Sequence, residues 1–149
     1  MKRFSGRRYP PQVSIPVQVT FDCANPDALA RFWCEALGYQ LQEPPAGYAS
    51  WPEWLRDKGV PQEQWNDASA AIDPDGHGPR LYFQRVPEGK TAKNRVHLDV
   101  NVGRDAVEAT LRRLVDHGAT VLRPPQTGER LGEFWAVLAD PEGNEFCLQ

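Results

Sequence analysis

The chain has 149 residues, of which 40% are hydrophobic and 25% charged, and its formal net charge is -3. This length allows one domain built from two small modules, but not two independent domains. The acidic balance argues against a nucleic-acid surface, and no segment approaches the roughly 20 apolar residues of a membrane span. We therefore expect no nucleic-acid partner and no membrane.

The first half of the chain predicts one strand, one helix and three further strands. Apolar residues alternate with polar ones from Ile15 to Phe21, which is typical of a half-buried strand. Asn25-Pro26-Asp27 is a favourable helix start, and Gly38 ends the helix. The remaining strands are expected at 39–42, 68–72 and 81–86.

Residues 43–67 interrupt this order. Ser50 and Glu53 have the spacing of a capping box, which predicts a short helix. The stretch from Asp27 to Asp73 is 11 residues longer than the corresponding stretch of the second half, from Asp105 to Asp140. We interpret the excess as an insertion that would lie over a functional groove.

The second half repeats the first. We expect a strand at 96–102, a helix from Asp105 to Gly118, a loop at 123–129, and strands near 119–122, 134–139 and 145–148. The turns 73–76 and 140–143 share the pattern Asp-Pro-Asp/Glu-Gly. The predicted fold class is α+β, with two βαβββ modules forming one cupped mixed sheet and helices outside. The predicted organisation is a disordered tail over 1–13 and one domain over 14–149, with modules at 14–88 and 94–149.

Polar residues occupy the strand positions that alternate with the apolar ones. They include Gln18 and Asp22 in the first module, and His97, Asp99 and Cys147 in the second. On an isolated antiparallel sheet this polar face would be exposed to solvent. Two such sheets joined at their edges would instead enclose a concave pocket between the modules.

Three stretches, 29–33, 93–99 and 140–147, resemble the vicinal oxygen chelate superfamily, which includes glyoxalase, bleomycin-resistance and extradiol dioxygenase proteins. The closest likeness is to its glyoxalase-like branch. The resemblance implies a small-molecule pocket inside the cupped sheet, and it implies pairing of the chain as a homodimer.

The resemblance also indicates where a metal would bind. The matching positions are Gln18, Gln84, His97 and Cys147, and Cys147 stands where a metal-binding glutamate is usual. One imidazole, one thiol and two neutral amides are a poor ligand set for Zn, Mn or Fe. We therefore expect no metal and no other cofactor.

The candidate catalytic residues are His97, Asp99 and Glu145. An imidazole can gain or lose a proton near neutral pH, and Asp99 lies two residues along the same strand face. Glu145 shares a strand face with Cys147. The alternative for His97 is a structural histidine that forms a hydrogen bond between strands.

The candidate substrate-binding residues are Gln18, Trp51, Gln84, Trp135 and Cys147. Aromatic walls suit a planar or aromatic small molecule, with Trp135 on a strand and Trp51 in the insertion. The alternative for Trp51 is packing that anchors the insertion. Cys147 is either a ligand contact, a nucleophile that needs a neighbouring base, or a small buried thiol.

The function predicted from these residues is metal-independent binding of a small molecule. One alternative is a metal-dependent lyase, isomerase or dioxygenase, and another is a metal-free enzyme that uses His97 for acid/base chemistry. The three cysteines show no CxxC spacing, so reduced thiols and a cytoplasmic location are expected.

Overall fold

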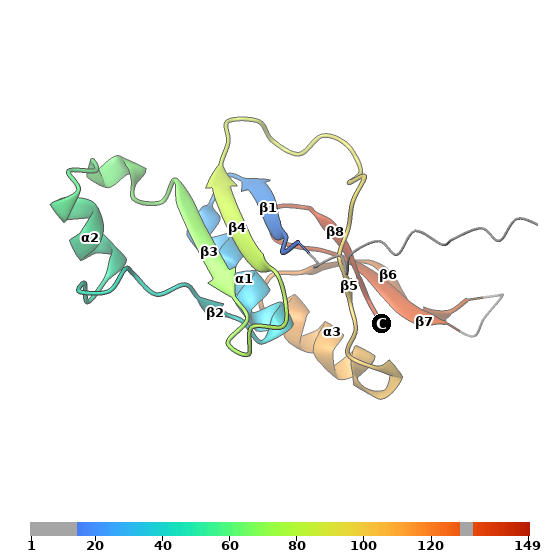
Figure 1. The fold of residues 1–149 in the computed structure, drawn as a ribbon. Helices are drawn as coiled ribbons and strands as arrows, with labels where there is room; N and C mark the ends of the chain where they lie inside the picture. Colours follow the sequence, from blue (N-terminus) through green and yellow to red (C-terminus); the bar gives the residue numbers. More distant parts are fainter. Residues whose placement is uncertain (1–14, 129–132) are drawn as a thin grey trace, which may run out of the picture.

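Two four-stranded sheets and several helices make up the described part of the chain (Figure 1). The computed structural model describes residues 15–128 and 133–149. The tail expected over 1–13 lies outside these described residues.

The first module forms a sheet with the strand order β1-β4-β3-β2. The parallel pair β1 and β4 results because α1 crosses over between β1 and β2, and the other strands pair antiparallel. The elements are β1 (Gln18–Cys23), α1 (Pro26–Leu37), β2 (Gln40–Leu41), β3 (Ala68–Ile72) and β4 (Arg80–Arg85).

The second module repeats this topology as β5-β8-β7-β6, again with one parallel pair, β5 and β8. Its elements are β5 (Asp99–Val100), η2 (Arg104–Ala106), α3 (Val107–Asp116), β6 (Thr120–Thr127), β7 (Phe134–Ala139) and β8 (Glu145–Leu148). The matching strand order confirms the predicted α+β fold of two βαβββ modules. In the structure they form two hydrogen-bonded sheets of four strands each.

Two strand boundaries differ from the prediction. The loop expected at 123–129 is wrong, because β6 continues through Pro124 and Pro125 to Thr127. β6 is the edge strand of its sheet, where a residue without an N–H is tolerated, and its register shifts on both sides of Arg123. β5 is shorter than the expected strand, because only two of its residues pair with β8.

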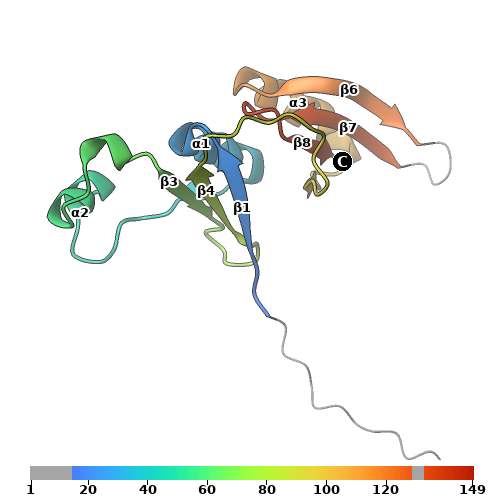
Figure 2. The same cartoon turned by 90° about the horizontal axis from the view of Figure 1, so that it is seen from above.

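Helix α1 connects the two sheets through its apolar face. The Asn25 side chain caps its start, and Gly38 ends it at a φ of 70°. The Trp33 ring lies 5.2 Å from the ring of Phe21 in β1 and 5.2 Å from the ring of Phe146 in β8. α1 therefore lies between the first sheet and β8, as Figure 2 shows from above.

The turn before β8 fastens the second module to α1. Asp140 is 2% exposed, and its Oδ2 accepts a hydrogen bond of 3.2 Å from the indole N–H of Trp33. Glu142 accepts hydrogen bonds from the backbone N–H groups of Ala24 and Asn25, just before α1. Burial raises the pKa of Asp140, and its hydrogen bonds act in the opposite direction.

The insertion forms α2 (Trp51–Asp57) and η1 (Gln62–Gln64) at the end of the molecule beyond β3 (Figures 1 and 2). The prediction that it covers a groove between the modules is wrong. α2 has no buried residue, and the indole N–H of Trp51 bonds to the carbonyl of Gln42, next to β2. This anchor holds α2 beside the outer strand of the first sheet.

No helix within the described residues is long and apolar enough to cross a membrane.

Replacing Trp33 with phenylalanine tests the junction between the modules. Trp33→Phe removes the N–H that satisfies the buried Asp140, so we expect the free energy of unfolding to fall by about 1–3 kcal/mol. Urea unfolding followed by circular dichroism measures the change. Trp51→Phe is the matched control, because its indole hydrogen bond is exposed, and we expect it to cost less than about 1 kcal/mol. Equal losses in the two variants would contradict the account.

Candidate functional site

The polar face of the second sheet carries the candidate site. Phe146 and Leu148 of β8 are buried in the core, so Cys147, which lies between them, faces the other way. Cys147 is paired with Asp99 of β5 and with Val137 of β7. Residues opposite one another in a ladder share a face, so Asp99 and Cys147 are brought together by strand register.

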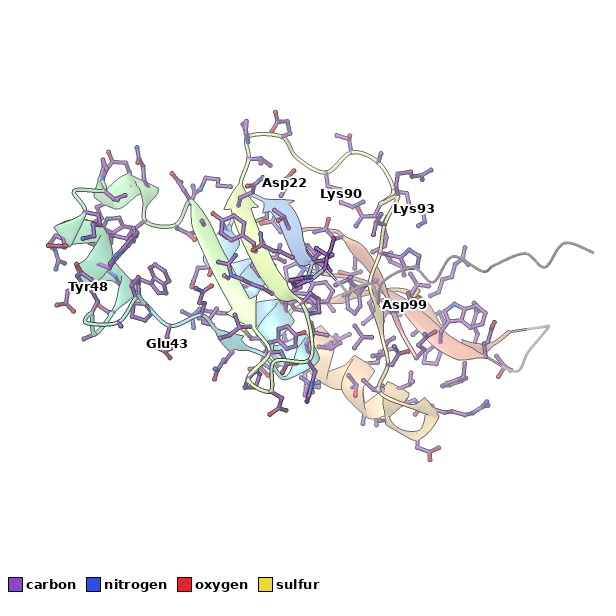
Figure 3. All side chains as sticks on the ribbon, viewed as in Figure 1. Asp22, Glu43, Tyr48, Lys90, Lys93 and Asp99 are labelled. Atoms are coloured by element: carbon purple, nitrogen blue, oxygen red, sulfur yellow. The ribbon has the colours of Figure 1, made fainter. Side chains whose placement is uncertain are left out.

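His97 joins this pair just before β5 begins. Its Nε2 lies 3.2 Å from Asp99 Oδ1, and both side chains are about half exposed. The ligand atoms of His97, Asp99 and Cys147 all lie within 4.8 Å of one another. We call these three residues the His97 cluster. Figure 3 shows Asp99 beside the segment that connects β4 to β5.

The Cys147 thiol is protonated in this setting. Partial burial raises its pKa, and the hydrogen bond to Asp99 raises it further, while the Lys93 ammonium acts in the opposite direction. A nucleophilic cysteine needs a lowered pKa. These surroundings therefore disfavour the thiolate that nucleophilic attack by Cys147 would need.

The Glu145 carboxylate forms contacts with the segment that connects the two modules. Its Oε2 accepts a hydrogen bond of 3.0 Å from the backbone N–H of Asn94 and lies 3.1 Å from Lys90 Nζ. The hydrogen bond from Asn94 is the largest of the contributions that lower the pKa of Glu145 to about 2. Lys90 lies on the connection between the modules (Figure 3). Glu145 therefore ties that connection to β8, and a carboxylate with so low a pKa is a weak proton acceptor near neutral pH.

A cavity of about 210 Å³ lies where the two modules meet. β1 contributes one wall, and residues 94–98 with Asn144 and Glu145 contribute the other. Val19, Phe21 and Trp33 make part of its lining apolar, and Asp22, Asn94 and His97 add polar groups. His97 thus belongs both to this junction cavity and to the His97 cluster.

Gln18 and Gln84 lie on the polar face of the first sheet and make other contacts. The Gln18 side-chain carbonyl accepts a hydrogen bond from Arg80, and Gln84 Nε2 donates one of 2.7 Å to Asp22. Neither residue lines the junction cavity. The structure does not bring these two glutamines to the His97 cluster.

The two candidate tryptophans lie in different places. Trp135 in β7 is two residues from Val137, the partner of Cys147, so it shares the polar face with the His97 cluster. Its ring lies against Gly128, where an added Cβ would come within 2.7 Å of it. Trp51 lies in α2, and Figure 3 shows Tyr48 of the same segment at the opposite end of the molecule from Asp99.

A larger hollow, about 390 Å³, lies on the helix side of the molecule. Arg31, Glu35 and His117 line it, with apolar groups from α1 and β2. Glu35 lies 3.8 Å from both Arg113 and His117, so the charged groups there already have partners. This hollow has the larger volume and also holds a half-exposed histidine, so it is the alternative position for a site. The junction cavity differs from it in lying where the two modules meet.

Arg80 and Lys90 are functional candidates that the sequence interpretation missed. Arg80 opens β4 on the same face as Gln18, and strand alternation alone could have identified it. Lys90 lies in a linker without periodicity, so no sequence pattern indicated its contact with Glu145.

The His97 cluster partly fits a divalent cation. One imidazole nitrogen, one carboxylate oxygen and one sulfur are suitable donors for Zn²⁺, and three protein ligands are the usual number in a catalytic zinc site. The thiol must lose its proton to bind, whereas its pKa is raised here. Asp99, not one of the two glutamines, provides the third donor.

Residues 18–149 match the Glyoxalase-like domain family, so the chain belongs to this family. No curated protein matches the sequence. The fold is similar to that of a glyoxalase/bleomycin resistance protein/dioxygenase family enzyme from Burkholderia phytofirmans, with 16% identity and a TM-score of 0.63 over 88% of this chain and 94% of that one.

Two fosfomycin resistance proteins have a similar fold. FosX from Mesorhizobium loti has 14% identity and a TM-score of 0.62, over 93% of this chain and 92% of that one. A mutant FosX from Listeria monocytogenes, solved with Mn(II) and a dihydroxypropylphosphonic acid, has 10% identity and a TM-score of 0.63, over 93% and 90%. These likenesses place the chain in the glyoxalase/bleomycin resistance/dioxygenase fold.

The pH dependence of stability tests the structural role of Glu145. A carboxylate whose pKa falls from 4.5 to about 2 on folding stabilises the protein fully above pH 4.5, and this contribution is lost as the pH falls toward 2. We expect Glu145→Gln to lower the melting temperature near neutral pH and to match the wild type near pH 2. Glu88→Gln, in an exposed part of the same linker, is the control and should change little. A gap between wild type and Glu145→Gln that does not narrow at low pH would contradict this role.

Proposed function

We propose that this protein binds a small organic molecule in the junction cavity, without a metal, and that His97 contacts the polar end of the ligand. The observation that supports the proposal is that His97 lines the cavity and that its Nε2 lies 3.2 Å from Asp99 Oδ1. An imidazole fixed by a carboxylate presents its second nitrogen in a defined direction. Membership of the glyoxalase-like family supports a site for small molecules in this region.

The lining of the cavity indicates the kind of ligand. Phe21 offers partly exposed aromatic surface, and Asn94 offers an amide beside His97. A volume of about 210 Å³ suits a compact molecule of one or two rings. We therefore propose a planar or aromatic ligand. We also propose that neither nucleic acid nor a membrane is a partner, and the acidic balance of the chain supports the first of these two statements.

The contacts of the cluster support metal-independent binding. Asp99 Oδ1 lies 3.2 Å from His97 Nε2, and the ligand atoms of Asp99 and Cys147 lie within 4.8 Å of each other, so the carboxylate already has protein groups beside it. The carboxylate of Glu145, also on β8, accepts a hydrogen bond from the backbone of Asn94 and pairs with Lys90.

A metal-dependent lyase, isomerase or dioxygenase is the second candidate. The nitrogen, oxygen and sulfur donors of the His97 cluster favour it, and the Listeria FosX variant was solved with Mn(II). In this case His97, Asp99 and Cys147 would hold the ion, which would supply a Lewis acid for an oxygen of the substrate. The protein's own part would be to position the substrate in the junction cavity.

A metal-free enzyme is the third candidate. The contact of 3.2 Å between His97 Nε2 and Asp99 Oδ1 would orient the imidazole, so His97 could exchange a proton with a bound substrate. Glu145 does not join this chemistry, because its carboxylate is bound to the linker.

The expected homodimer and cytoplasmic location remain proposals. Val17 and Val96, near the two strands that flank the junction cavity, are 70% and 80% exposed, and a second copy would cover such apolar side chains. The three cysteines are all free, which agrees with a reducing compartment.

Variants of the two histidines test the position of the site. A fragment library of planar compounds, screened by ligand-observed NMR, would identify a binder. We expect His97→Ala to weaken its binding about tenfold, the equivalent of ~1.4 kcal/mol, because a hydrogen bond to a fixed ring is lost. His117→Ala is the matched control on the helix-side hollow and should leave the affinity unchanged. The reverse pattern would place the site in that hollow.

Metal analysis tests the second candidate. We expect untagged protein to hold less than a stoichiometric amount of Zn, Mn, Ni or Fe, and the fragment to bind equally well with and without EDTA. Asp99→Asn should then weaken the fragment only modestly, because the amide oxygen still accepts from His97. Stoichiometric metal that is lost in Asp99→Asn and Cys147→Ser, with fragment binding lost in EDTA, would replace the proposal by the metal-dependent alternative.

A further inference from the structure

Arg80 lies in a prearranged setting on the polar face of the first sheet, away from the His97 cluster. Its Nε donates a hydrogen bond of 2.7 Å to Gln42 Oε1, and its Nη1 donates one to Gln18 Oε1. Its guanidinium carbon lies 5.0 Å from the centre of the Tyr82 ring. We call Arg80, Gln18, Gln42 and Tyr82 the Arg80 cradle.

Register explains why these side chains converge. Gln18 and Arg80 are direct partners in the parallel pair of β1 and β4, so they share a face. Gln42 follows β2, and its backbone N–H bonds to Ala70, which is the partner of Tyr82. Three strands and the segment after β2 thus fix one guanidinium.

One glutamine amide and the backbone of the other are also held in place. Gln18 Nε2 donates a hydrogen bond of 3.3 Å to Thr20, which turns its carbonyl oxygen toward Arg80. The backbone carbonyl of Gln42 accepts a hydrogen bond of 2.7 Å from the indole N–H of Trp51, which fixes the main chain at that residue. The guanidinium is therefore oriented before any ligand arrives, which lowers the entropic cost of binding.

The charge of Arg80 is not neutralised in the part of the chain that the structure describes. Arg31, Arg85 and Arg113 each lie within 4.0 Å of a carboxylate there, whereas the partners of Arg80 are two neutral amides and a ring. A guanidinium has five N–H donors, and the two amides use two of them. Three donors, including both on Nη2, remain for a planar anion.

We propose that the Arg80 cradle is a binding site for the carboxylate of a small organic acid. A carboxylate matches the planar fork of a guanidinium with two parallel hydrogen bonds and supplies the missing negative charge. Tyr82 offers an aromatic surface beside the cation for an aromatic acid. This site goes beyond the proposed function, because it shares no residue with the junction cavity or the His97 cluster.

Benzoate is the probe for this site, and benzamide is its neutral counterpart. In ¹H–¹⁵N spectra of the full chain, we expect benzoate to shift the amides of Gln18, Gln42 and residues 80–82, none of which lines the junction cavity, with a Kd on the order of 1 mM. Benzamide has no charge to pair with Arg80 and should shift none of them at the same concentration.

Gln18→Glu is the decisive variant, because it gives Arg80 a carboxylate from the protein itself. The new ion pair preserves the fold, and we expect it to weaken benzoate binding about tenfold or more. Arg85→Met, at the other end of β4, removes an arginine that Asp67 already neutralises, and it should bind benzoate like the wild type.

Three results would overturn this inference. They are an absence of benzoate binding to the wild type, equal binding by Gln18→Glu, or shifts confined to residues near His97 and Cys147. The last result would leave the proposed function standing while removing the Arg80 site. Loss of the His97 site in the fragment experiments would in turn leave the Arg80 site untouched.

Discussion

The buried carboxylate of Asp140 is the constraint on which the arrangement of the two modules depends. It accepts the indole N–H of Trp33 from the first module and backbone N–H groups of its own turn, those of Glu142 and Asn144. A buried carboxylate without such donors would be costly, so α1 must lie where Trp33 can reach it. That position sets Phe146 against α1 and fixes the polar face of β8 on the opposite side, where Cys147 meets Asp99.

Strand periodicity and helix caps predicted most of the fold. The alternation around Phe21 and around Val100 identified the first strand of each module, and Asn25 with Gly38 bounded α1 within one residue. The pairing of Asp99 with Cys147 also follows from alternation, once the parallel pairing of β5 and β8 is assumed. These features are local or depend on a period of two, so a single sequence carries them.

Other features depend on contacts that no local pattern encodes. Asp140 was interpreted as a hairpin-turn residue, although it also joins the modules through Trp33. Glu145 was a catalytic candidate because it shares a strand face with Cys147. Its contact with Asn94 crosses 51 positions of the chain, so no local pattern could indicate it. The insertion lies beyond β3, where the indole N–H of Trp51 bonds to the backbone carbonyl of Gln42. The tryptophan content of the insertion could not show on which side of the molecule it lies.

The central claim is that His97 is the contact between a bound small molecule and the rest of the site. The most direct measurement is a crystal structure of the protein with a bound planar fragment. We predict that the fragment lies between β1 and residues 94–98, that one of its polar atoms is within hydrogen-bonding distance of the His97 ring, and that Asp99 still contacts His97 Nε2. A fragment seated between Arg31 and His117 on the helix side, with the junction cavity empty, would contradict it.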